Sequence, residues 1–494
     1  MLIASAVLVG ASGAARSSNS DPPTPAGATA AAKSKSHVPD GDWLQFNYNA
    51  QRSGAGPTST GITAGNVNTL KQRIVHLPGT VDSSPIQLHA VRVKHRTRDV
   101  VVVTTTYGRT IAIDPGTGAE LWQFTPGDIH RYQGTLQFTT ASPTADPDRR
   151  YVYASSPDGY IHKLAVATGR QAWERRVTLD PTHEKLASPP TVNGGALVVV
   201  TDGYLGDAPP YQGHVVTINR STGRIEHVFN TLCSSRHRLI VPKTCGASDS
   251  AIWGRGGAVI EPGTGRILVA TGNGPFNGHT DWGDSVLELS SDAAHLLHNF
   301  TPANQAYLNS TDRDLGSTSP ALLPNPGGPP LAAQGGKDDN FKLLNLARLD
   351  GTPGGAGPTL GGQLQTIAVP GTTQLYTQPA VWVHNGKTYL FAADESATGA
   401  YVLQNGSSPQ LAMTWQRNSP GTSPIVAGGL LFVFDQIHGK LNVFDPLSGH
   451  QVASLGAASG HWNAPIVIGG RIILPVGNAN DRPTSGELFT YHLP

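Results

Sequence analysis

The stretch IDPGTGAELW at residues 113–122 carries the pattern that decides the fold. An acidic residue opens a tight turn by bonding its own backbone, and glycine takes the left-handed conformation that other residues resist. Alternating apolar residues on both sides of the turn indicate strands that pack on one face. The turn returns with variation along the chain, as VATGRQAW (166–173), RSTGRI (220–225), EPGTGRI (261–267) and DPLSGH (445–450).

A proline preceded by small or polar residues marks the start of the repeated units. It stands before an apolar, β-rich run at Pro85, Pro143, Pro189, Pro320, Pro379, Pro424 and Pro465. Four strands per unit, at spacings of about 40 to 70 residues, predict the blades of a propeller. We expect eight innermost strands, the fourth of them without the proline, near Ser84, Ser142, Ser188, Ala251, Ser319, Gln378, Ser423 and Ala464.

The two ends of the chain complete one blade in this interpretation. The last unit, which ends in GELFTYHLP, has only three strands, and an unassigned strand at residues 72–77 precedes the first unit. An outer strand supplied from the N-terminus would close the ring and remove an exposed edge. We therefore expect an all-β, eight-bladed β-propeller of four-stranded antiparallel blades over residues 42–494. A stack of separate β-sandwiches is the alternative, whereas a helical solenoid is excluded by the lack of helical periodicity.

The N-terminal segment indicates export. Residues 1–16 contain an apolar run followed by small residues, which resembles a secretory signal peptide without its usual positive start. Residues 17–41 are rich in Ala, Ser and Pro and predict a flexible linker. An extracytoplasmic location, periplasmic or secreted, favours a disulfide between Cys233 and Cys245; two free buried thiols are the alternative.

The composition argues against several partners. Lys plus Arg is 35 and Asp plus Glu is 34, so the formal net charge is only +1. This balance gives no electrostatic reason to expect nucleic acid as a partner. The apolar run near the N-terminus is too short for a stable membrane span. The sequence has no CxxCH motif, so we expect no attached haem.

The repeated turn resembles the pyrroloquinoline quinone (PQQ) repeat. Quinoprotein alcohol dehydrogenases share this repeat with non-enzymatic propellers that act in outer-membrane assembly. The resemblance covers about residues 43–494. It implies the propeller fold more strongly than the chemistry, because the repeated Trp and Gly residues serve blade packing.

The resemblance also implies site residues, in one order along the chain. Asn273, in VATGNGPFNG, is similar to the family's asparagine beside the quinone, and an amide oxygen suits calcium or a lanthanide. Asp312 and Asp314 are candidates for the catalytic base, or for metal ligand plus base if a strand-like spacing points both to one side. Lys337 is similar to the cation that touches the quinone carbonyl. Each candidate also has a purely structural interpretation: a strand-ending turn for Asn273, an Asp-rich loop for Asp312 and Asp314, and a solvated loop lysine for Lys337.

The chain departs from the dehydrogenases at three points. The family's adjacent cysteines are absent, since Cys233 and Cys245 stand far apart. The quinone-stacking tryptophan would fall near Arg255, two residues from Trp253, and an arginine stacks on a flat anion in a different way. The glutamate metal ligand has no clear counterpart, and only Asp207 offers a substitute.

Two functions follow from these patterns. The first is a non-catalytic binding or assembly scaffold that holds a protein, glycan or small-molecule ligand on one face and keeps a vestigial quinone or metal pocket. The second is a PQQ- and metal-dependent dehydrogenase that oxidises alcohols or polyols.

His461 and Trp462 lie beside the last inner strand. Their side chains either point into the axial channel or pack between blades.

Overall fold

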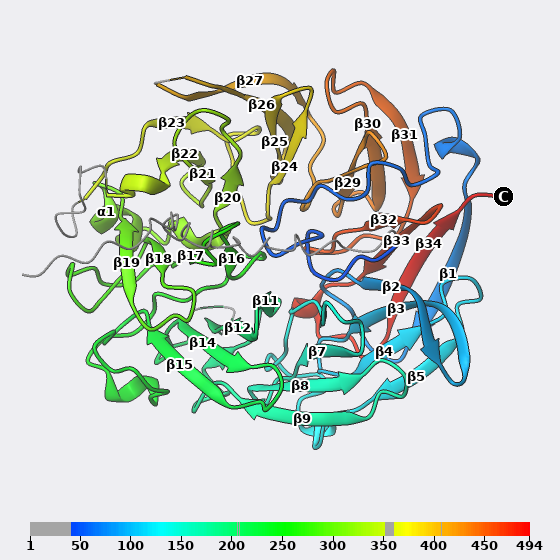
Figure 1. The fold of residues 1–494 in the computed structure, drawn as a ribbon, viewed down its shortest axis with the longest axis horizontal. Helices are drawn as coiled ribbons and strands as arrows, with labels where there is room; N and C mark the ends of the chain where they lie inside the picture. Colours follow the sequence, from blue (N-terminus) through cyan, green and yellow to red (C-terminus); the bar gives the residue numbers. More distant parts are fainter. Residues whose placement is uncertain (1–40, 205, 207, 351–359, 407) are drawn as a thin grey trace, which may run out of the picture. The chain divides into compact units, whose positions relative to one another are not determined.

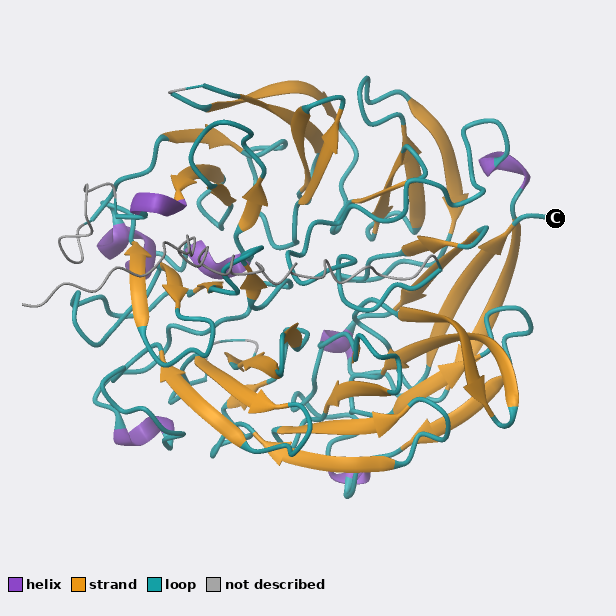
Figure 2. Ribbon diagram, viewed as in Figure 1, coloured by secondary structure: helices purple, strands orange, loops and turns teal. Residues whose placement is uncertain are grey.

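The computed structural model describes residues 41–494 apart from 205, 207, 351–359 and 407. In this part of the chain, eight four-stranded antiparallel sheets stand around a common axis (Figure 1). Strands make up nearly all of the regular structure, and the helices are short (Figure 2). The predicted eight-bladed propeller is therefore confirmed. The predicted signal peptide and almost all of the predicted linker lie outside the described residues.

The blades follow one another along the chain, and the strands of each blade are ordered from the innermost outward. Blade 1 is β2 (Ile86–Val93), β3 (Arg96–Thr104), β4 (Thr110–Ile113) and β5 (Glu120–Phe124). Blade 2 is β6 (Thr144–Ala145), β7 (Tyr151–Ser155), β8 (Tyr160–Ala165) and β9 (Gln171–Arg176). Blade 3 is β11 (Thr191–Asn193), β12 (Ala196–Val200), β14 (His214–Asn219) and β15 (Ile225–Asn230). Blade 4 is β16 (Val259–Ile260), β17 (Ile267–Ala270), β18 (Val286–Leu289) and β19 (Leu296–Phe300).

The second half of the ring has the same build. Blade 5 is β20 (Ala321–Leu323), β21 (Leu331–Gln334), β22 (Asn340–Asn345) and β23 (Gln365–Ala368). Blade 6 is β24 (Ala380–His384), β25 (Lys387–Ala393), β26 (Thr398–Gln404) and β27 (Gln410–Arg417). Blade 7 is β28 (Ile425–Ala427), β29 (Leu430–Asp435), β30 (Lys440–Phe444) and β31 (Gln451–Gly456). Blade 8 is β32 (Ile466–Ile468), β33 (Arg471–Val476), β34 (Gly486–His492) and β1 (Lys71–Leu77).

Blade 8 joins the two ends of the described chain. Strand β1 pairs with β34 in an antiparallel register that runs from Lys71 opposite His492 to Leu77 opposite Gly486. Figure 1 shows the blue strand β1 beside the red strand β34. The predicted closure by an N-terminal strand is therefore confirmed, and it covers an edge that would otherwise be free to pair with another chain.

The inner strand of blade 4 does not begin near Ala251 as the sequence suggested. It begins at Val259, and the residues in between form a loop. Glycines explain the difference, because a side chain at Gly254 would collide with the backbone of Thr318 and one at Gly256 with Ser319. The loop can therefore press closely against the next blade, and it carries two of the predicted site residues.

A tryptophan in the outer strand of one blade locks onto the glycine turn of the next. The Trp122 indole N–H donates to the carbonyl of Val166 at 2.7 Å, and a Cβ at Gly169 would collide with the indole ring. The same arrangement joins blade 2 to blade 3 and blade 6 to blade 7, through Trp173 over Gly223 and Trp415 over Gly449. The repeated Trp and Gly residues of the sequence therefore hold neighbouring blades together.

A segment before β1, residues 43–60, occupies the axial channel. Its backbone or side chains bond the second residue of the inner strand in six blades: Gln87, Ala145, Val192, Ile260, Val381 and Val426. At its centre the fully buried Arg52 donates to the carbonyls of Gly256, Phe46, Pro189 and Pro190. The segment therefore closes the channel at this level of the axis.

Helices contribute little to the described structure. The one α-helix, α1 (Gln305–Ser310), has six residues. The 3₁₀ turns are η1 (Val67–Thr69), η2 (Ile129–Arg131), η3 (Pro242–Thr244), η4 (Leu315–Ser317), η5 (Leu346–Arg348) and η6 (Ala479–Asp481). Among the described residues no helix has the length and apolar character needed to span a bilayer.

Candidate functional site

A cavity of about 640 Å³ lies at one end of the axial channel. Several residues that line it stand four positions before an inner strand, namely Thr140, Ala187, Tyr376 and Trp462. In three of these four blades, the segment at residues 43–60 bonds the inner strand further along, at Ala145, Val192 and Val381. The cavity therefore sits above that segment, at the level where the inner strands begin.

Six residues predicted from the sequence line this one cavity. They are Trp253, Arg255, Asn273, Asp312, Asp314 and Lys337. The loop before blade 4 carries Trp253 and Arg255, and the end of β17 leads to Asn273. Both aspartates lie between α1 and η4, and Lys337 follows β21. Asp207, the seventh candidate, lies outside the described residues.

Lys337 sits between the two aspartates. Its Nζ lies 2.8 Å from Oδ1 of Asp312 and also contacts Oδ2 of Asp314. The Asp314 side chain is 4% exposed and that of Asp312 60% exposed, so Asp314 is the buried partner. The expected strand-like spacing is wrong, because Asp312 has a left-handed backbone (φ 52°) in a turn after α1. The turn nevertheless brings both carboxylates to the same amine.

The charges of this cluster depend on one another. Burial raises the pKa of Asp314, and the charge and hydrogen bond of Lys337 oppose that increase. Burial lowers the pKa of Lys337, but the attraction of Asp314 and Asp312 outweighs it and leaves the pKa above its ordinary value. Asp314 also accepts a hydrogen bond from the backbone N–H of Asn273 at 2.5 Å. The geometry therefore holds Lys337 as an ammonium paired with a buried carboxylate.

A third carboxyl group, Asp284, lies buried behind Asp314. It accepts hydrogen bonds from the backbone N–H of Leu315 at 3.1 Å and from Nε2 of Gln305 at 3.4 Å. Burial, followed by the nearby charge of Asp314, raises its pKa well above the usual range. Burial and the charge of Asp314 therefore both oppose the ionisation of Asp284.

Aromatic rings form one wall of the cavity. The rings of Trp253 and Trp462 stack with centroids 6.0 Å apart, and Tyr376 stacks on Trp462 at 5.6 Å. His461 stacks on Trp462 at 4.2 Å. Lys337 lies 5.2 Å from the centre of the Trp253 ring. The wall therefore offers flat π-surfaces beside a cation, an arrangement that attracts planar anionic molecules.

A second charged group lies beside Trp462. The buried Arg255 places its guanidinium carbon 5.6 Å from the Trp462 ring centre and donates from Nη2 to the backbone carbonyl of Asp82 at 2.7 Å. Asp82 binds His461 Nδ1 at 2.7 Å. Burial raises the pKa of Asp82, but His461 and Arg255 outweigh it and hold that pKa below its ordinary value. The Nη1 atom of Arg255 is buried and has no hydrogen-bond partner among the described residues.

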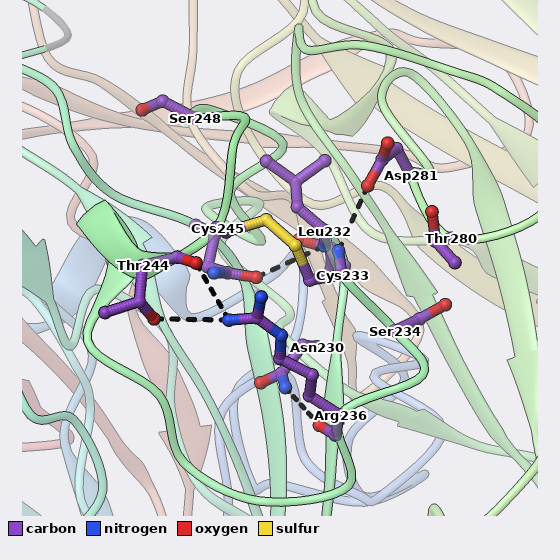
Figure 3. The surroundings of a disulfide bond; sticks show 12 residues. Asn230, Leu232, Cys233, Ser234, Arg236, Thr244, Cys245, Ser248, Thr280 and Asp281 are labelled. Carbon is purple, nitrogen blue, oxygen red and sulfur yellow. Dashed lines mark hydrogen bonds between the residues drawn. A yellow bond between two sulfur atoms is a disulfide. The ribbon is translucent and has the colours of Figure 1, made fainter.

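The two cysteines are joined by a disulfide (Figure 3). Their Cα atoms are 6.1 Å apart, and the backbone N–H of Cys233 donates to Oδ1 of Asp281. Neither cysteine lines the cavity. The bridge therefore fastens the loop after blade 3 and does not replace the strained ring that the family places against its quinone.

The residues present do not fit the metal ion that the resemblance implies. The ammonium of Lys337 already lies at bonding distance from both Asp312 and Asp314. In the described part of the chain, the one group of three His, Cys, Asp or Glu side chains close enough to share an ion is Cys233, Cys245 and Asp281. Its two sulfur atoms are bonded to each other. A flat quinone anion fits the aromatic wall and the flanking cations better than a metal fits the carboxylates.

Sequence reasoning missed several residues of the cavity. Tyr376 and Lys185 carry no family motif, and the sequence favours blade packing as the role of Trp462. The proline motif offered a signal, because Thr140, Tyr376 and Trp462 each stand three residues before the proline of their blade and line the cavity. This position lines the cavity in three of the seven units that have the proline, so it narrows the candidates at the mouth of the channel.

Comparison with known proteins supports the same family resemblance. The family model described as outer membrane protein assembly factor BamB matches residues 107–269. No curated protein sequence matches the chain. A quinohemoprotein alcohol dehydrogenase from Comamonas testosteroni is 14% identical, with a TM-score of 0.67 over 91% of this chain and 80% of that one.

Two further solved structures have the same fold. A quinohemoprotein alcohol dehydrogenase from Pseudomonas putida HK5 is 14% identical, with a TM-score of 0.69 over 92% of this chain and 80% of that one. A europium-containing methanol dehydrogenase is 14% identical, with a TM-score of 0.68 over 92% and 98%. The resemblance to PQQ-repeat propellers related to quinoprotein dehydrogenases is therefore confirmed. Identities this low show the shared fold alone.

Proposed function

We propose that this chain is an exported binding propeller whose axial cavity holds a small planar anion without a bound metal ion. The observation that carries this proposal is the position of Lys337, whose ammonium neutralises Asp312 and Asp314 in place of a divalent or trivalent cation. The stacked rings of Trp253 and Trp462 supply the surface for a flat ligand. The disulfide supports export, because such bonds persist in oxidising compartments.

The cavity face is also the face that we propose for a protein or glycan partner. Loops that enter the inner strands gather there, and loops on a rigid scaffold are the usual carriers of binding residues. The opposite level of the channel is closed by residues 43–60. A ligand therefore enters from the end of the channel at which the inner strands begin.

A PQQ- and metal-dependent alcohol dehydrogenase is the second candidate. It is favoured by the convergence of Asn273, Asp314 and Lys337 on one cavity, in the chain order that the family resemblance implies. Its activity would require Lys337 to release Asp314 to a cation, at the cost of separating a buried ion pair.

Retention of PQQ tests both candidates. The purified protein is mixed with PQQ alone, with PQQ and calcium, or with PQQ and a light lanthanide, and free cofactor is removed by gel filtration. The binding propeller predicts quinone absorbance in all three samples and no dye reduction on addition of alcohols or polyols. Retention that requires the metal, together with dye reduction, supports the dehydrogenase instead. Absence of PQQ from every sample at micromolar protein overturns the proposal.

A pair of variants shows where the quinone binds. Trp462→Ala removes the central ring of the aromatic wall and should abolish retention. Tyr307→Ala serves as the matched control, because Tyr307 is 54% exposed on α1 and does not line the cavity. Equal retention by the two variants would show that the absorbance comes from binding elsewhere on the propeller.

A further inference from the structure

A second lysine in the cavity, Lys185, has a different environment from Lys337. It lies on β10 (Glu184–Lys185), which pairs with β13 (Asp202–Gly203) so that Lys185 stands opposite Asp202. This small sheet brings Lys185 and Gly203 to the cavity, where Phe138 and Tyr204 line the neighbouring surface. Lys185 as a whole is half-buried and lines the cavity.

The amine of Lys185 is not held by an anion. Its Nζ lies 4.5 Å from the centre of the Phe138 ring. Among the described residues no hydrogen bond joins it to an acceptor, and no carboxylate lies within 4.0 Å of it. Burial lowers the pKa of Lys185; the charges of Asp202 and Asp82 oppose this decrease, and that of Arg255 adds to it. A desolvated amine near another cation is the usual setting of a nucleophilic lysine.

We propose that Lys185 is a carbonyl-reactive lysine that binds aldehydes in the cavity as a Schiff base. Lys185 lines the cavity, and its amine lies over the face of the Phe138 ring and has no ion-pair partner in the part of the chain that the structure describes. This activity goes beyond the proposed binding of a planar anion, because it is a covalent reaction at a residue outside the aromatic wall.

The reaction needs no reagent other than the aldehyde. The lone pair of the neutral amine forms a C–N bond to the carbonyl carbon, and the C=O π-bond breaks. A proton passes from nitrogen to oxygen and gives a carbinolamine. The hydroxyl then takes up a proton and leaves as water while the nitrogen lone pair forms the C=N bond. The resulting iminium gives up its N–H proton, so no net proton is consumed. We assign the proton transfer to Asp202, relayed through one water molecule, because Asp202 stands opposite Lys185 in the β10–β13 register but its carboxylate is too far from the amine for a direct transfer.

The surroundings select aromatic aldehydes over aliphatic ones. The cavity of about 640 Å³ is large enough for a small ring compound, and the aromatic side chains of Trp253, Trp462 and Tyr376 line it. An aromatic ring that stacks against these side chains binds more tightly than an aliphatic chain of similar size. We therefore expect benzaldehyde to react at Lys185 faster than propanal does.

The test is reductive labelling of the full chain. The protein is incubated with benzaldehyde and cyanoborohydride at pH 7, and the modified lysines are quantified by peptide mass spectrometry. Lys94 and Lys387, both exposed, serve as internal references in the same sample. Each unit by which a lysine pKa is lowered raises the fraction of free amine about tenfold at this pH. We expect Lys185 to be labelled several-fold faster than either reference. When the pH is raised, the labelling rate of Lys185 should reach its plateau at a lower pH than the rates of the references do.

Two variants provide the controls. Lys185→Arg keeps the positive charge but forms no stable imine, so it should lose the selective label. Lys94→Arg removes an exposed lysine and should leave the labelling of Lys185 unchanged. If Lys185 in the unaltered protein reacts no faster than Lys94 and Lys387, the proposal is wrong, and this outcome does not depend on whether the variants fold. PQQ retention is measured separately, so failure of the labelling test leaves the proposed binding of a planar anion standing.

Discussion

Two lysines, Lys337 and Lys185, line the same cavity, and their surroundings shift their pKa values in opposite directions. Lys337 contacts two carboxylates, one of them buried, and its pKa lies above the ordinary value. Lys185 contacts the Phe138 ring, has no ion pair within 4 Å among the described residues, and has a lowered pKa. One cavity can therefore hold a fixed ammonium and a reactive amine, because local partners and burial set the protonation of each.

The largest difference between the two lysines should appear in stability. Lys337→Met leaves Asp314 buried without its cation, which should lower the free energy of unfolding by about 3–5 kcal/mol. Lys185→Met removes a cation that has no ion pair among the described residues, so it should change the stability by less than about 1 kcal/mol in either direction. Urea unfolding at pH 7, followed by tryptophan fluorescence, measures both. Equal losses in the two variants would mean that Lys337 is not held by Asp314 as the structure indicates.

The neighbours of Lys185 give the next largest effect. Asp202→Asn removes a negative charge that favours the ammonium, so the pKa of Lys185 should fall further. If Asp202 did not carry the proton, the labelling rate with benzaldehyde at pH 7 would rise by up to about tenfold per pKa unit. Because we assign the proton transfer to Asp202, we expect the free-amine fraction to rise while the rate of imine formation falls.

The two quantities can be measured apart. The labelling rate against pH gives the pKa of the amine from its midpoint and the efficiency of imine formation from its plateau. We expect a lower midpoint together with a lower plateau in Asp202→Asn. A plateau equal to that of the unaltered protein would remove Asp202 from the reaction and leave it only an electrostatic role.

The sequence predicted the framework of the cavity better than its chemistry. The turn at residues 113–122 and its copies fix the blades, and three of the copies place a glycine (Gly169, Gly223 and Gly449) under the tryptophan of the preceding blade. The family resemblance implies that Asn273, Asp314 and Lys337 belong to one site, because they follow one another in the same order as the family's site residues. Lys185 could not be found in this way, since its pairing with Asp202 arises from a short sheet of four residues that no periodic pattern reveals. The contact between Lys337 and Asp314 likewise depends on the turn after α1. The spacing of Asp312 and Asp314 had indicated a strand at this place.

The stability should also depend on pH with opposite sign at the two lysines. The folded-state pKa of Lys337 lies above its unfolded value, so its contribution is complete below an unfolded pKa of about 10.4 and is lost as the pH rises through the folded pKa. The folded-state pKa of Lys185 lies below the unfolded value. Between these two values the unfolded chain binds a proton that the folded chain does not, so stability rises with pH.

The Lys185 part of this prediction can be isolated by difference. Unfolding of the unaltered protein and of Lys185→Met is measured at pH 7, 8, 9 and 10, so that groups common to both chains cancel. The unaltered protein should gain stability relative to the variant as the pH rises, by about 1.4 kcal/mol for each unit between the two pKa values. A relative loss over this range would mean that Lys185 is stabilised as an ammonium, like Lys337.

The smallest expected effect separates the two carboxylates that hold Lys337. Asp312 lies 2.8 Å from the amine, but its side chain is 60% exposed, so water solvates it nearly as well as the lysine does. Asp312→Asn should therefore lower the free energy of unfolding by less than about 1 kcal/mol, in the range measured for exposed ion pairs. High salt should shrink the effect further, whereas the loss in Lys337→Met should persist, because salt screens buried pairs only weakly. A loss for Asp312→Asn as large as that for Lys337→Met would transfer the role of anchor from Asp314 to Asp312, and the ammonium would then be held from the solvent side of the cavity.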